Sequence, residues 1–304
     1  MSISKAIAPV AGLGTRLLPT TKVLPKEMLP VGRLPVIHHV VEELIAAGIR
    51  QILFVTAGNK GAIEDHFDEG SELMRRLEAE QHELLETCRF QYRDRGVEFF
   101  SVRQRIAPGQ NKPAGTGDAV AAGEAFVGDE PFVVAFGDSI VRTRAGKPLL
   151  QRMIASHREH NSACTIGAYP VSDELVHHYG ILIPETSNTT DSKLTGILEK
   201  PRPEQTTSRL AISARYIFSP DIFNRIRTTS PSSSGEIYLT DAIEALISAG
   251  EMVRAVCLSK DEKRCDIGNH LAYFQTFVDY ALDDPEWGEQ IRTYMQQKLA
   301  ENRS

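Results

Sequence analysis

The sequence predicts an α/β protein with a mixed, mostly parallel central sheet flanked by helices. Short apolar runs alternate with segments of helical periodicity along most of the chain, which is the pattern of strand–helix units. The first apolar run ends in the glycine-rich turn Ala11-Gly12-Leu13-Gly14, as a buried strand does where it opens into a loop. With 304 residues, of which 41% are apolar, the chain is long enough for a large α/β core.

In the first half of the chain, strands are expected where about five apolar residues follow one another. These runs are 6–10, 52–56, 97–102 and 132–136. Helices are expected where apolar residues recur every three or four positions, in the segments 36–47, 62–67, 71–87 and 119–126. Gly48 supplies the stop of the first helix, and the many charges of 71–87 predict an outlying helix.

The second half of the chain predicts shorter strands between helices. The expected strands are 164–169, 180–183, 196–198 and 211–218. The expected helices are 149–160, 240–248, 272–282 and 286–300. The segments 186–192 and 228–235 are rich in serine and threonine and too short for domain linkers, so they are expected to be loops. The last helix is amphipathic, which suits a surface or a subunit interface.

The charge balance restricts the partners. Lys and Arg number 34 against 40 Asp and Glu, and the net charge of −6 argues against nucleic acid or a membrane surface as partner. A small pocket with a few cations aimed at phosphates remains compatible with it. The N-terminus lacks the apolar segment of a signal peptide and no run of about 18 apolar residues occurs, so we expect a cytoplasmic protein. The four cysteines form no CxxC pair and are expected to be reduced thiols.

The strongest chemical signal lies in the first thirty residues. A glycine-rich turn after a buried strand lets backbone N–H groups approach phosphate oxygens closely. The turn is not a dinucleotide fingerprint, because Leu17 stands where the third glycine is required, and the chain has no P-loop motif. Arg16 and Lys26 add two cations beside the turn, held by the nearby prolines. A nucleoside triphosphate needs such cations when its α-phosphorus is attacked and pyrophosphate leaves.

Two motifs together resemble the sugar-1-phosphate nucleotidylyltransferases. They are Gly-Leu-Gly-Thr-Arg-Leu-Leu-Pro-Thr-Thr-Lys at 12–22 and Pro-Lys-Glu-Met-Leu-Pro at 25–30, and the resemblance extends over about 4–283. It implies a Rossmann-like nucleotidyltransferase fold with a catalytic domain at 1–268. Within that domain it implies a nucleotide-binding part at about 1–140 and a small β-rich sugar-binding part at about 141–268. The C-terminal helices at 269–304 would pack subunits of a homo-oligomer.

The resemblance also implies the reaction. The Lys-Glu-Met-Leu-Pro form is most similar to family members that use UTP and α-D-glucose 1-phosphate and produce UDP-glucose and pyrophosphate. In that reaction Arg16 and Lys26 are the catalytic residues, which hold the triphosphate and stabilise the departing pyrophosphate. The implied nucleotide-binding residues are Ala11, Gly12, Gly14, Thr15, Glu27, Gln104, Gly117 and Asp118.

Gln104 matches the glutamine with which the family reads the base. A primary amide can donate and accept hydrogen bonds at once, which suits the edge of uracil. The segment Gly115-Thr116-Gly117-Asp118-Ala119 matches a second glycine turn that opens a helix beneath the nucleoside. Asp118 departs from the family pattern, because uridylyltransferases of this type usually carry histidine at that position.

The resemblance implies Mg²⁺ as cofactor, held by Asp138 and Asp266. Asp138 lies at the end of a predicted central strand, where ligands of open α/β sheets bind, and Asp266 belongs to a late Asp-x-Gly-Asn motif. Carboxylate oxygens are ligands that Mg²⁺ prefers. The sugar phosphate is assigned to Gly180, Glu199 and Lys200 in the Tyr-Gly and Glu-Lys-Pro motifs, with the lysine neutralising the phosphate.

The sequence leaves alternatives open. Asp118 and Leu34, which replaces a lysine usual in the family, are compatible with another nucleotide such as dTTP or another sugar 1-phosphate. Arg33 is a candidate to replace the missing cation. A weakly active regulatory paralogue that binds a nucleotide sugar is a second alternative, although the intact site motifs argue against it. A glycosyltransferase is disfavoured because no Asp-x-Asp follows the first glycine turn.

Overall fold

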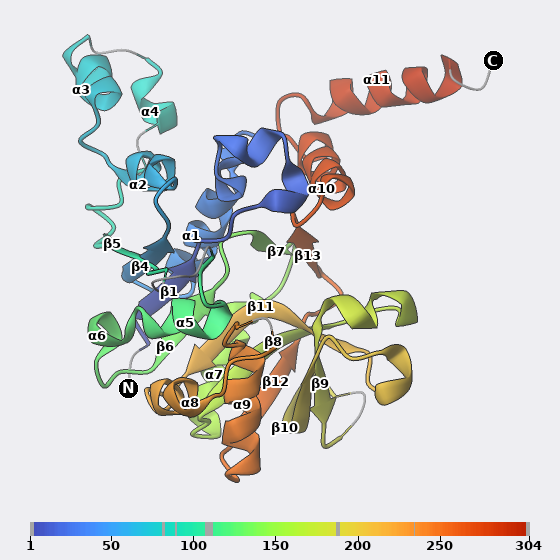
Figure 1. Ribbon diagram of the computed structural model, residues 1–304. Helices are drawn as coiled ribbons and strands as arrows, with labels where there is room; N and C mark the ends of the chain where they lie inside the picture. The colour runs from blue at the N-terminus through green and yellow to red at the C-terminus, as the bar shows by residue number, and fades with distance from the viewer. Residues whose placement is uncertain are drawn as a thin grey trace.

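A nine-stranded sheet forms the centre of the fold (Figure 1). The computed structural model describes residues 3–80, 83–88, 90–106, 112–186, 189–233 and 235–301. The strands of the large sheet are β1 (Lys5–Pro9), β4 (Gln51–Thr56), β5 (Glu98–Arg103), β6 (Phe132–Ala135), β8 (Cys164–Pro170), β9 (Gly180–Pro184), β10 (Asp191–Glu199), β11 (Leu210–Phe218) and β12 (Val253–Cys257). Their order is β5-β4-β1-β6-β11-β8-β12-β10-β9. Two small sheets pair β7 (Ser139–Thr143) with β13 (Glu262–Asp266) and β2 (Pro30–Val31) with β3 (Leu34–Pro35).

Helices connect and cover these strands. They are α1 (Val36–Ala46), α2 (Gly61–Phe67), α3 (Glu72–Ala79), α4 (Leu85–Cys88), α5 (Thr116–Ala121), α6 (Glu124–Val127), α7 (Leu149–Glu159), α8 (Ile222–Thr228), α9 (Leu239–Ser248), α10 (His270–Leu282) and α11 (Gly288–Glu301). Short 3₁₀ turns occupy Thr15–Leu17, Thr20–Lys22, Lys26–Met28, Asp173–His178 and Pro203–Gln205.

Two expected helices are each divided in the structure. The segment 71–87 contains α3 and α4, and residues 81 and 82 between them lie outside the described residues. The segment 119–126 contains parts of α5 and α6, which meet at Gly123. A Cβ at Gly123 would lie 2.4 Å from Cδ1 of Ile7, so the chain approaches the sheet here more closely than a larger residue allows.

The sheet is mixed, as predicted, but the prediction that it is mostly parallel is wrong. Among the described strands the parallel pairs are β5–β4, β4–β1, β1–β6 and β8–β12. The antiparallel pairs are β6–β11, β11–β8, β12–β10, β10–β9 and β11–β9. Alternating strands and helices build only the β5-β4-β1-β6 half as a parallel sheet. In the other half, β11 returns between β6 and β8 in the opposite direction, and β9 and β10 form a hairpin.

Strand β11 joins the two halves of the sheet. One edge of β11 pairs with β8, while the other pairs first with β9, at Leu210 and Ala211, and then with β6, from Arg215 to Phe218. The register with β8 shifts between the two regions, where Ala214 adopts a φ of 62°. Such a bulge bends a strand and redirects its edge. The large sheet therefore runs across residue 140, the predicted boundary between the nucleotide-binding and sugar-binding parts; the domain division itself stays a prediction.

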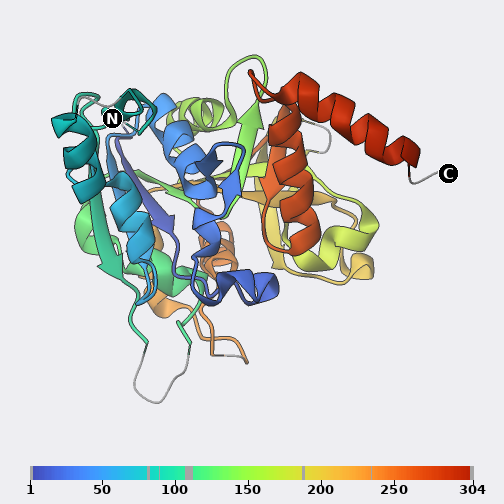
Figure 2. The ribbon, with the colours of Figure 1, turned by 90° about the horizontal axis from the view of Figure 1, so that it is seen from above.

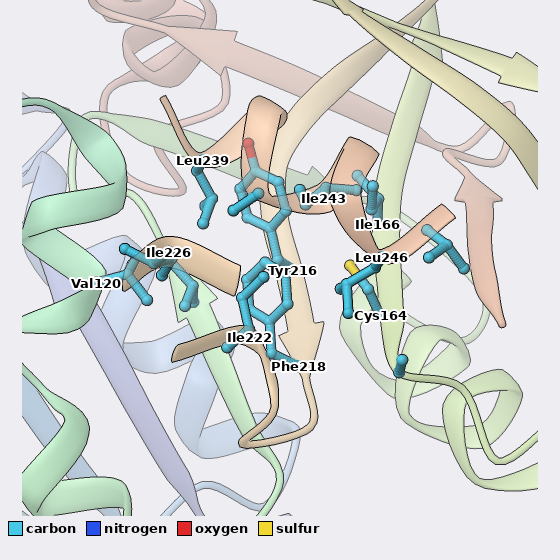
Figure 3. Close-up of a cluster of buried hydrophobic side chains, with 14 of the residues drawn as sticks. Val120, Cys164, Ile166, Tyr216, Phe218, Ile222, Ile226, Leu239, Ile243 and Leu246 are labelled. Carbon is cyan, nitrogen blue, oxygen red and sulfur yellow. The ribbon is translucent and has the colours of Figure 1, made fainter. Parts of the chain in front are cut away.

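Alternating side chains of the sheet fill two cores, one on each face. On one face Ile7, Val134 and Tyr216 pack with α5, α8 and α9, and Figure 3 shows part of this cluster around Tyr216 and Phe218. On the other face Ala8, Val133 and their neighbours pack with α1 and α7. Because successive strand residues point to opposite faces, strands buried on both sides consist of continuous apolar runs. This explains why 52–56 and 132–136 could be identified from composition alone.

The C-terminal helices lie at one end of the molecule. Helix α10 packs against β13 and β2, whereas α11 extends away from the body (Figures 1 and 2). Within the part of the chain that is described, no helix combines the length and apolar character needed to cross a lipid bilayer. Cys88, Cys164, Cys257 and Cys265 are free thiols, as predicted.

Candidate functional site

The carboxyl ends of β1, β5 and β6 open onto a pocket of about 680 Å³, which is closed on its other side by residues of β9, β10 and β11. Ligands of α/β sheets bind at this edge. The predicted site residues that line the pocket are Ala11, Gly12, Gly14, Thr15, Lys26, Glu27, Gln104, Asp138, Gly180, Glu199 and Lys200. Arg16, Gly117, Asp118 and Asp266 are not among the lining residues, but each contacts or adjoins one of the motifs around it.

The first glycine turn follows β1 and bends sharply. Gly14 has a φ of 67°, and its carbonyl oxygen accepts a hydrogen bond of 2.8 Å from Oγ1 of Thr21. A Cβ at Gly12 would lie 3.4 Å from Nζ of Lys26, so the ammonium group is next to the backbone of the turn. The turn and the Lys26 cation thus face the same space, as the sequence predicted.

Four charged groups form a continuous chain that begins in the pocket lining and ends at the buried Lys60. Nζ of Lys26 is ion-paired with Oδ2 of Asp138 and lies 4.0 Å from Oε1 of Glu27. Oε2 of Glu27 lies 2.7 Å from Nζ of Lys60. The side chains of Glu27 and Lys60 are only 1% and 2% exposed. Lys60 was not among the predicted residues, because nothing in its local sequence indicates a partner 33 residues earlier in the chain.

The pKa shifts of Lys26, Asp138 and Glu27 reflect the alternation of positive and negative groups along this chain of contacts. Burial lowers the pKa of the Lys26 ammonium, but the Asp138 and Glu27 carboxylates raise it more, so its pKa lies above the ordinary value. Burial raises the pKa of Asp138, but Lys26 lowers it more, so its pKa lies below the ordinary value. Burial raises the pKa of Glu27, and Lys26 and Lys60 offset this only in part. Lys26 and Asp138 are therefore both charged at neutral pH.

Arg16 lies beside the motif that contains Asp266. A Cβ at Gly268 would lie 3.2 Å from Nη2 of Arg16 and 3.0 Å from Oδ1 of Asp266. The Oδ1 atom accepts a hydrogen bond of 2.8 Å from the backbone N–H of Gly268. The first glycine turn and the late Asp-x-Gly-Asn motif, which are about 250 residues apart in the sequence, therefore meet at this guanidinium group.

The two predicted metal ligands lie at the ends of neighbouring segments. Strand β7 begins directly after Asp138 and pairs with β13, where Ser139 is opposite Asp266. The backbone N–H of Ile267 also donates to the carbonyl oxygen of Asp138 at 3.4 Å. In the described parts of the chain, no three or more His, Cys, Asp or Glu side chains gather as they would around a metal held by protein alone. The two carboxylates fit the preference of Mg²⁺, which binds one or two protein carboxylates together with substrate phosphates and water.

Arg264 is a pocket residue that the sequence analysis missed. Its guanidinium lies over the rings of Tyr169 and Tyr179, with centroids at 5.1 and 5.2 Å. Nη1 donates to the Tyr169 hydroxyl at 3.0 Å, and Nη2 lies 3.1 Å from Oδ2 of Asp266. Nε is buried and has no partner within the described residues. Burial lowers the pKa of Arg264, but Asp266 and the tyrosines raise it more, so the group stays charged.

Arg264 could have been found from its spacing to Asp266. Residues two apart on a strand point to the same face, so a strand at 262–266 places both side chains on one side. The segment Glu262–Asp266 has few apolar residues, so it was not predicted as a strand.

The predicted sugar-phosphate residues form a compact group at the other end of the pocket. Oε2 of Glu199 accepts a hydrogen bond of 2.9 Å from Oγ1 of Thr240, and Oε1 lies 3.1 Å from Nζ of Lys200. A Cβ at Gly180 would lie 2.5 Å from Cδ1 of Ile212 and 3.5 Å from Oε2 of Glu199, so the glycine allows its backbone to approach β11 and the Glu199 carboxylate closely. Lys200 also lies over the ring of Tyr238, at 5.6 Å. Thr240 and Tyr238 were not among the single site residues predicted from the sequence.

Gln104 and Asp118 are directly hydrogen-bonded. Nε2 of Gln104 donates to Oδ2 of Asp118 at 2.7 Å and to the carbonyl oxygen of Gly115 at 3.1 Å. A Cβ at Gly117 would lie 2.8 Å from Cγ2 of Ile237, so this glycine is required for packing of α5. Asp118 thus contacts the predicted base-reading residue and is not itself part of the pocket lining.

Arg33 does not replace the lysine that is missing at Leu34. Its guanidinium is ion-paired with Asp284 at 2.7 Å and with Glu286 at 2.8 Å, beyond the end of α10. Arg33 is not among the residues that line the pocket. The departure from the family at this position therefore has no compensating cation from Arg33.

Several known proteins are similar to this chain in sequence and in structure. The chain is 39% identical over 295 residues to UTP–glucose-1-phosphate uridylyltransferase of Bacillus subtilis, covering 97% of this chain and 96% of that protein. Its structure is similar to that of a UTP-bound UGPase from Acinetobacter baumannii, with a TM-score of 0.87, 34% identity, and coverage of 97% of this chain and 99% of that one. It is also similar to a UDP-glucose pyrophosphorylase complexed with UDP-glucose, with a TM-score of 0.79, 30% identity, and coverage of 93% and 100%.

A family model described as nucleotidyl transferase matches residues 5–282. This range includes all of the predicted site residues and agrees with the resemblance found in the sequence motifs. The chain belongs to the nucleotidyl transferase family.

Proposed function

We propose that this chain is a UTP–glucose-1-phosphate uridylyltransferase, which transfers a uridylyl group from UTP to α-D-glucose 1-phosphate and releases pyrophosphate. The order of the pocket residues across the sheet carries this proposal. Gln104 follows β5 at one edge, Lys26 and Asp138 lie around the ends of β1 and β6, and Glu199 lies on β10 toward the other edge. An amide, a cationic phosphate site and a hydroxyl-binding carboxylate follow one another, as base, diphosphate and hexose do in UDP-glucose.

The reaction requires positioning and charge neutralisation more than proton transfer. A sugar phosphate is already an anion at neutral pH, so its oxygen can attack the α-phosphorus in line without a general base. Lys26 and Arg16 would hold the triphosphate and stabilise the charge that develops on the departing pyrophosphate. Phosphate oxygens compete with Asp138 for the Lys26 ammonium, because both are anionic partners of the same group.

Asp138 and Asp266 would hold Mg²⁺, which neutralises phosphate charge when bound. Arg264 lies between this pair and the sugar end, because it contacts Asp266 and also lines the pocket. Its charged guanidinium, held against Tyr169 and Tyr179 at the pocket wall, suits a phosphate or sugar oxygen. We assign Glu199 to the sugar hydroxyls and Lys200 to the sugar phosphate, with the backbone of Gly180 facing the hexose.

The proposal is tested by pyrophosphate release. Wild-type protein is incubated with glucose 1-phosphate and Mg²⁺, and UTP, dTTP, CTP, ATP and GTP are compared in parallel. We expect strong preference for UTP. Preference for dTTP would move the assignment to another member of the family with the same chemistry. No release with any nucleotide, from folded protein that still binds UDP-glucose in calorimetry, would favour the regulatory paralogue. The same assay without Mg²⁺ tests the cofactor and is expected to abolish turnover.

We also propose that the C-terminal helices pack against a second copy of the chain. Large apolar side chains on α10, on α11 and between them are 40 to 67% exposed, namely Leu271, Phe274, Phe277, Trp287, Tyr294 and Leu299. Exposed large apolar side chains gathered on these two neighbouring helices favour an interaction site, and α11 extends away from the body (Figure 2). The expectation of a cytoplasmic enzyme stays a prediction.

Sedimentation velocity tests the oligomer. Wild-type protein is expected to sediment well above the 33.7 kDa of one chain, and the double variant Leu271→Ser/Phe274→Ser is expected to shift toward that mass. Leu73→Ser on α3 changes an equally exposed leucine outside this surface and is the control. A monomeric wild type, or equal behaviour of both variants, contradicts the proposal.

A further inference from the structure

The amide of Gln104 has two neighbours that can only accept hydrogen bonds. One is the carboxylate of Asp118, at 2.7 Å from Nε2, and the other is the backbone carbonyl oxygen of Gly115, at 3.1 Å. An amide oxygen placed against either neighbour would oppose lone pair to lone pair. The nitrogen of Gln104 therefore has to face Asp118 and Gly115, and the opposite orientation of the amide is excluded by these contacts.

The frame that holds these groups is rigid. The backbone N–H of Gln104 donates to the carbonyl oxygen of Thr56 at 2.9 Å, which fixes the residue at the end of β5. Ile237 is hydrogen-bonded to the second glycine turn on both sides of Gly115. Its N–H donates to the carbonyl oxygen of Ala114 at 2.7 Å, and its carbonyl oxygen accepts from the N–H of Gly117 at 2.8 Å. These bonds fix the backbone that carries the Gly115 carbonyl and the first turn of α5, from which the Asp118 side chain reaches the amide nitrogen.

The carbonyl oxygen of Gln104 is left for a ligand. Oε1 has no hydrogen-bond donor among the described residues, although the side chain as a whole is only 8% exposed. Gln104 is also the only described lining residue of the pocket that has a side-chain amide. Gln104 thus offers the pocket a hydrogen-bond acceptor, and the contacts of its Nε2 with Asp118 and Gly115 fix the orientation of that acceptor.

We propose that Asp118 is a positioning residue that selects the nucleobase by fixing the amide of Gln104 with its oxygen toward the base. The inference rests on the proposed function and on the role of Gln104 in it. Uracil carries a donor at N3, which matches a fixed acceptor. Cytosine carries an unprotonated N3 at the same ring position, where its lone pair would oppose Oε1. Binding of a base without a donor at this position would leave Oε1 of Gln104 desolvated and without a hydrogen bond. Such a base is therefore strongly disfavoured.

The proposal also explains why the residue at 118 is acidic here. A side chain that both donates and accepts, such as asparagine, would allow the Gln104 amide to turn over and present its NH₂ to the base. A carboxylate removes that freedom because it has no donor. The departure at Asp118 would then sharpen base selection instead of relaxing it.

The test compares UTP with CTP in wild-type protein, in Asp118→Asn and in the control Asp129→Asn. The control makes the same change of charge at an exposed position after α6. The ratio of kcat/KM for UTP over CTP is expected to fall about tenfold in Asp118→Asn, the order expected for losing a charge-assisted hydrogen bond, and to stay unchanged in the control. Equal loss with both nucleotides in Asp118→Asn, with an unchanged ratio, would mean a merely structural role and would overturn the proposal.

A double-mutant cycle shows whether Asp118 acts through Gln104. In a Gln104→Ala background, Asp118→Asn is expected to leave the UTP-to-CTP ratio unchanged, because the amide it orients is gone. A further fall of the ratio in that background would overturn the proposal.

Equilibrium binding of UTP and CTP by calorimetry separates this inference from the proposed function. One outcome is that wild-type protein fails to turn over UTP and still binds UTP more tightly than CTP, with a preference that Asp118→Asn reduces. That result overturns the proposed function and leaves the base-selection role intact. Wild-type protein that binds both nucleotides equally overturns the base-selection role.

Discussion

Replacing Lys26 with methionine is expected to lower kcat for pyrophosphate release by about 10²- to 10³-fold, the effect of removing one fixed group that stabilises transition-state charge. Methionine has a similar length and apolar stem but no charge. The ammonium of Lys26 lies next to the first glycine turn and is kept protonated by Asp138 and Glu27. Its contribution should be largest when charge develops on the leaving group, so kcat should fall more than KM rises.

Lys260→Met is the matched control for this experiment. Lys260 is exposed and lies outside the pocket lining, so steady-state kinetics with UTP and glucose 1-phosphate should match wild type. Near-full turnover of Lys26→Met with unchanged substrate binding would contradict the catalytic role of Lys26. Circular dichroism of both variants establishes that the comparison concerns folded protein.

The second large effect concerns stability. Replacing Lys60 with methionine is expected to lower the free energy of unfolding by about 3 kcal/mol, because the buried Glu27 carboxylate loses its partner at 2.7 Å and keeps only the more distant Lys26, at 4.0 Å, among the ion pairs of the described residues. The loss is measured by urea unfolding. The double variant Lys60→Met/Glu27→Gln removes the unpaired charge and is expected to recover part of that stability.

The pH dependence of Lys60→Met gives an independent readout. Burial already raises the pKa of Glu27 in wild type, and loss of Lys60 removes one of the groups that lower it. A carboxyl group whose pKa is higher in the folded than in the unfolded protein binds more protons when folded, so stability falls as pH rises through the window between the two values. The deficit of Lys60→Met should therefore be larger at pH 8 than at pH 5. A deficit independent of pH would contradict the role of a buried charge.

Most of the central elements could be predicted because both faces of the strands are buried. The strand expected at 52–56 is β4, and the helix expected at 149–160 is α7. Strands β7 and β13 were not identified, because a two-stranded ribbon needs no continuous apolar run and β13 reads Glu-Lys-Arg-Cys-Asp. Strand β12 was also not identified, and neither was α8. The direction of β11 depends on pairing across the sheet, which periodicity does not encode.

The candidate site was predicted where its residues are close in sequence to a recognisable motif. The glycine turn with Lys26 and the Glu199-Lys200 pair belong to such motifs, and the structure brings them to one pocket. The side chains that pair with these residues, or with others of the site, come from distant parts of the sequence. Lys60 reaches Glu27 from the segment after β4, and Asp118 reaches Gln104 from the first turn of α5. Such contacts follow from the packing of the sheet and not from any local pattern.

The double pairing of β11 has a mechanical consequence for the pocket. One uninterrupted strand is hydrogen-bonded to β6, which leads to Asp138, and to β9, which begins at Gly180. A hinge that separated these two ends would have to break one of the two ladders, and the bend at Ala214 lies between them. A short stretch of hydrogen-bonded backbone in β11 thus sets the distance between the ends of β6 and β9, where Asp138 and Gly180 lie. Under the proposed function, the enzyme would hold its two substrates at a fixed separation, and adjustment would fall to side chains and to the loops around the pocket.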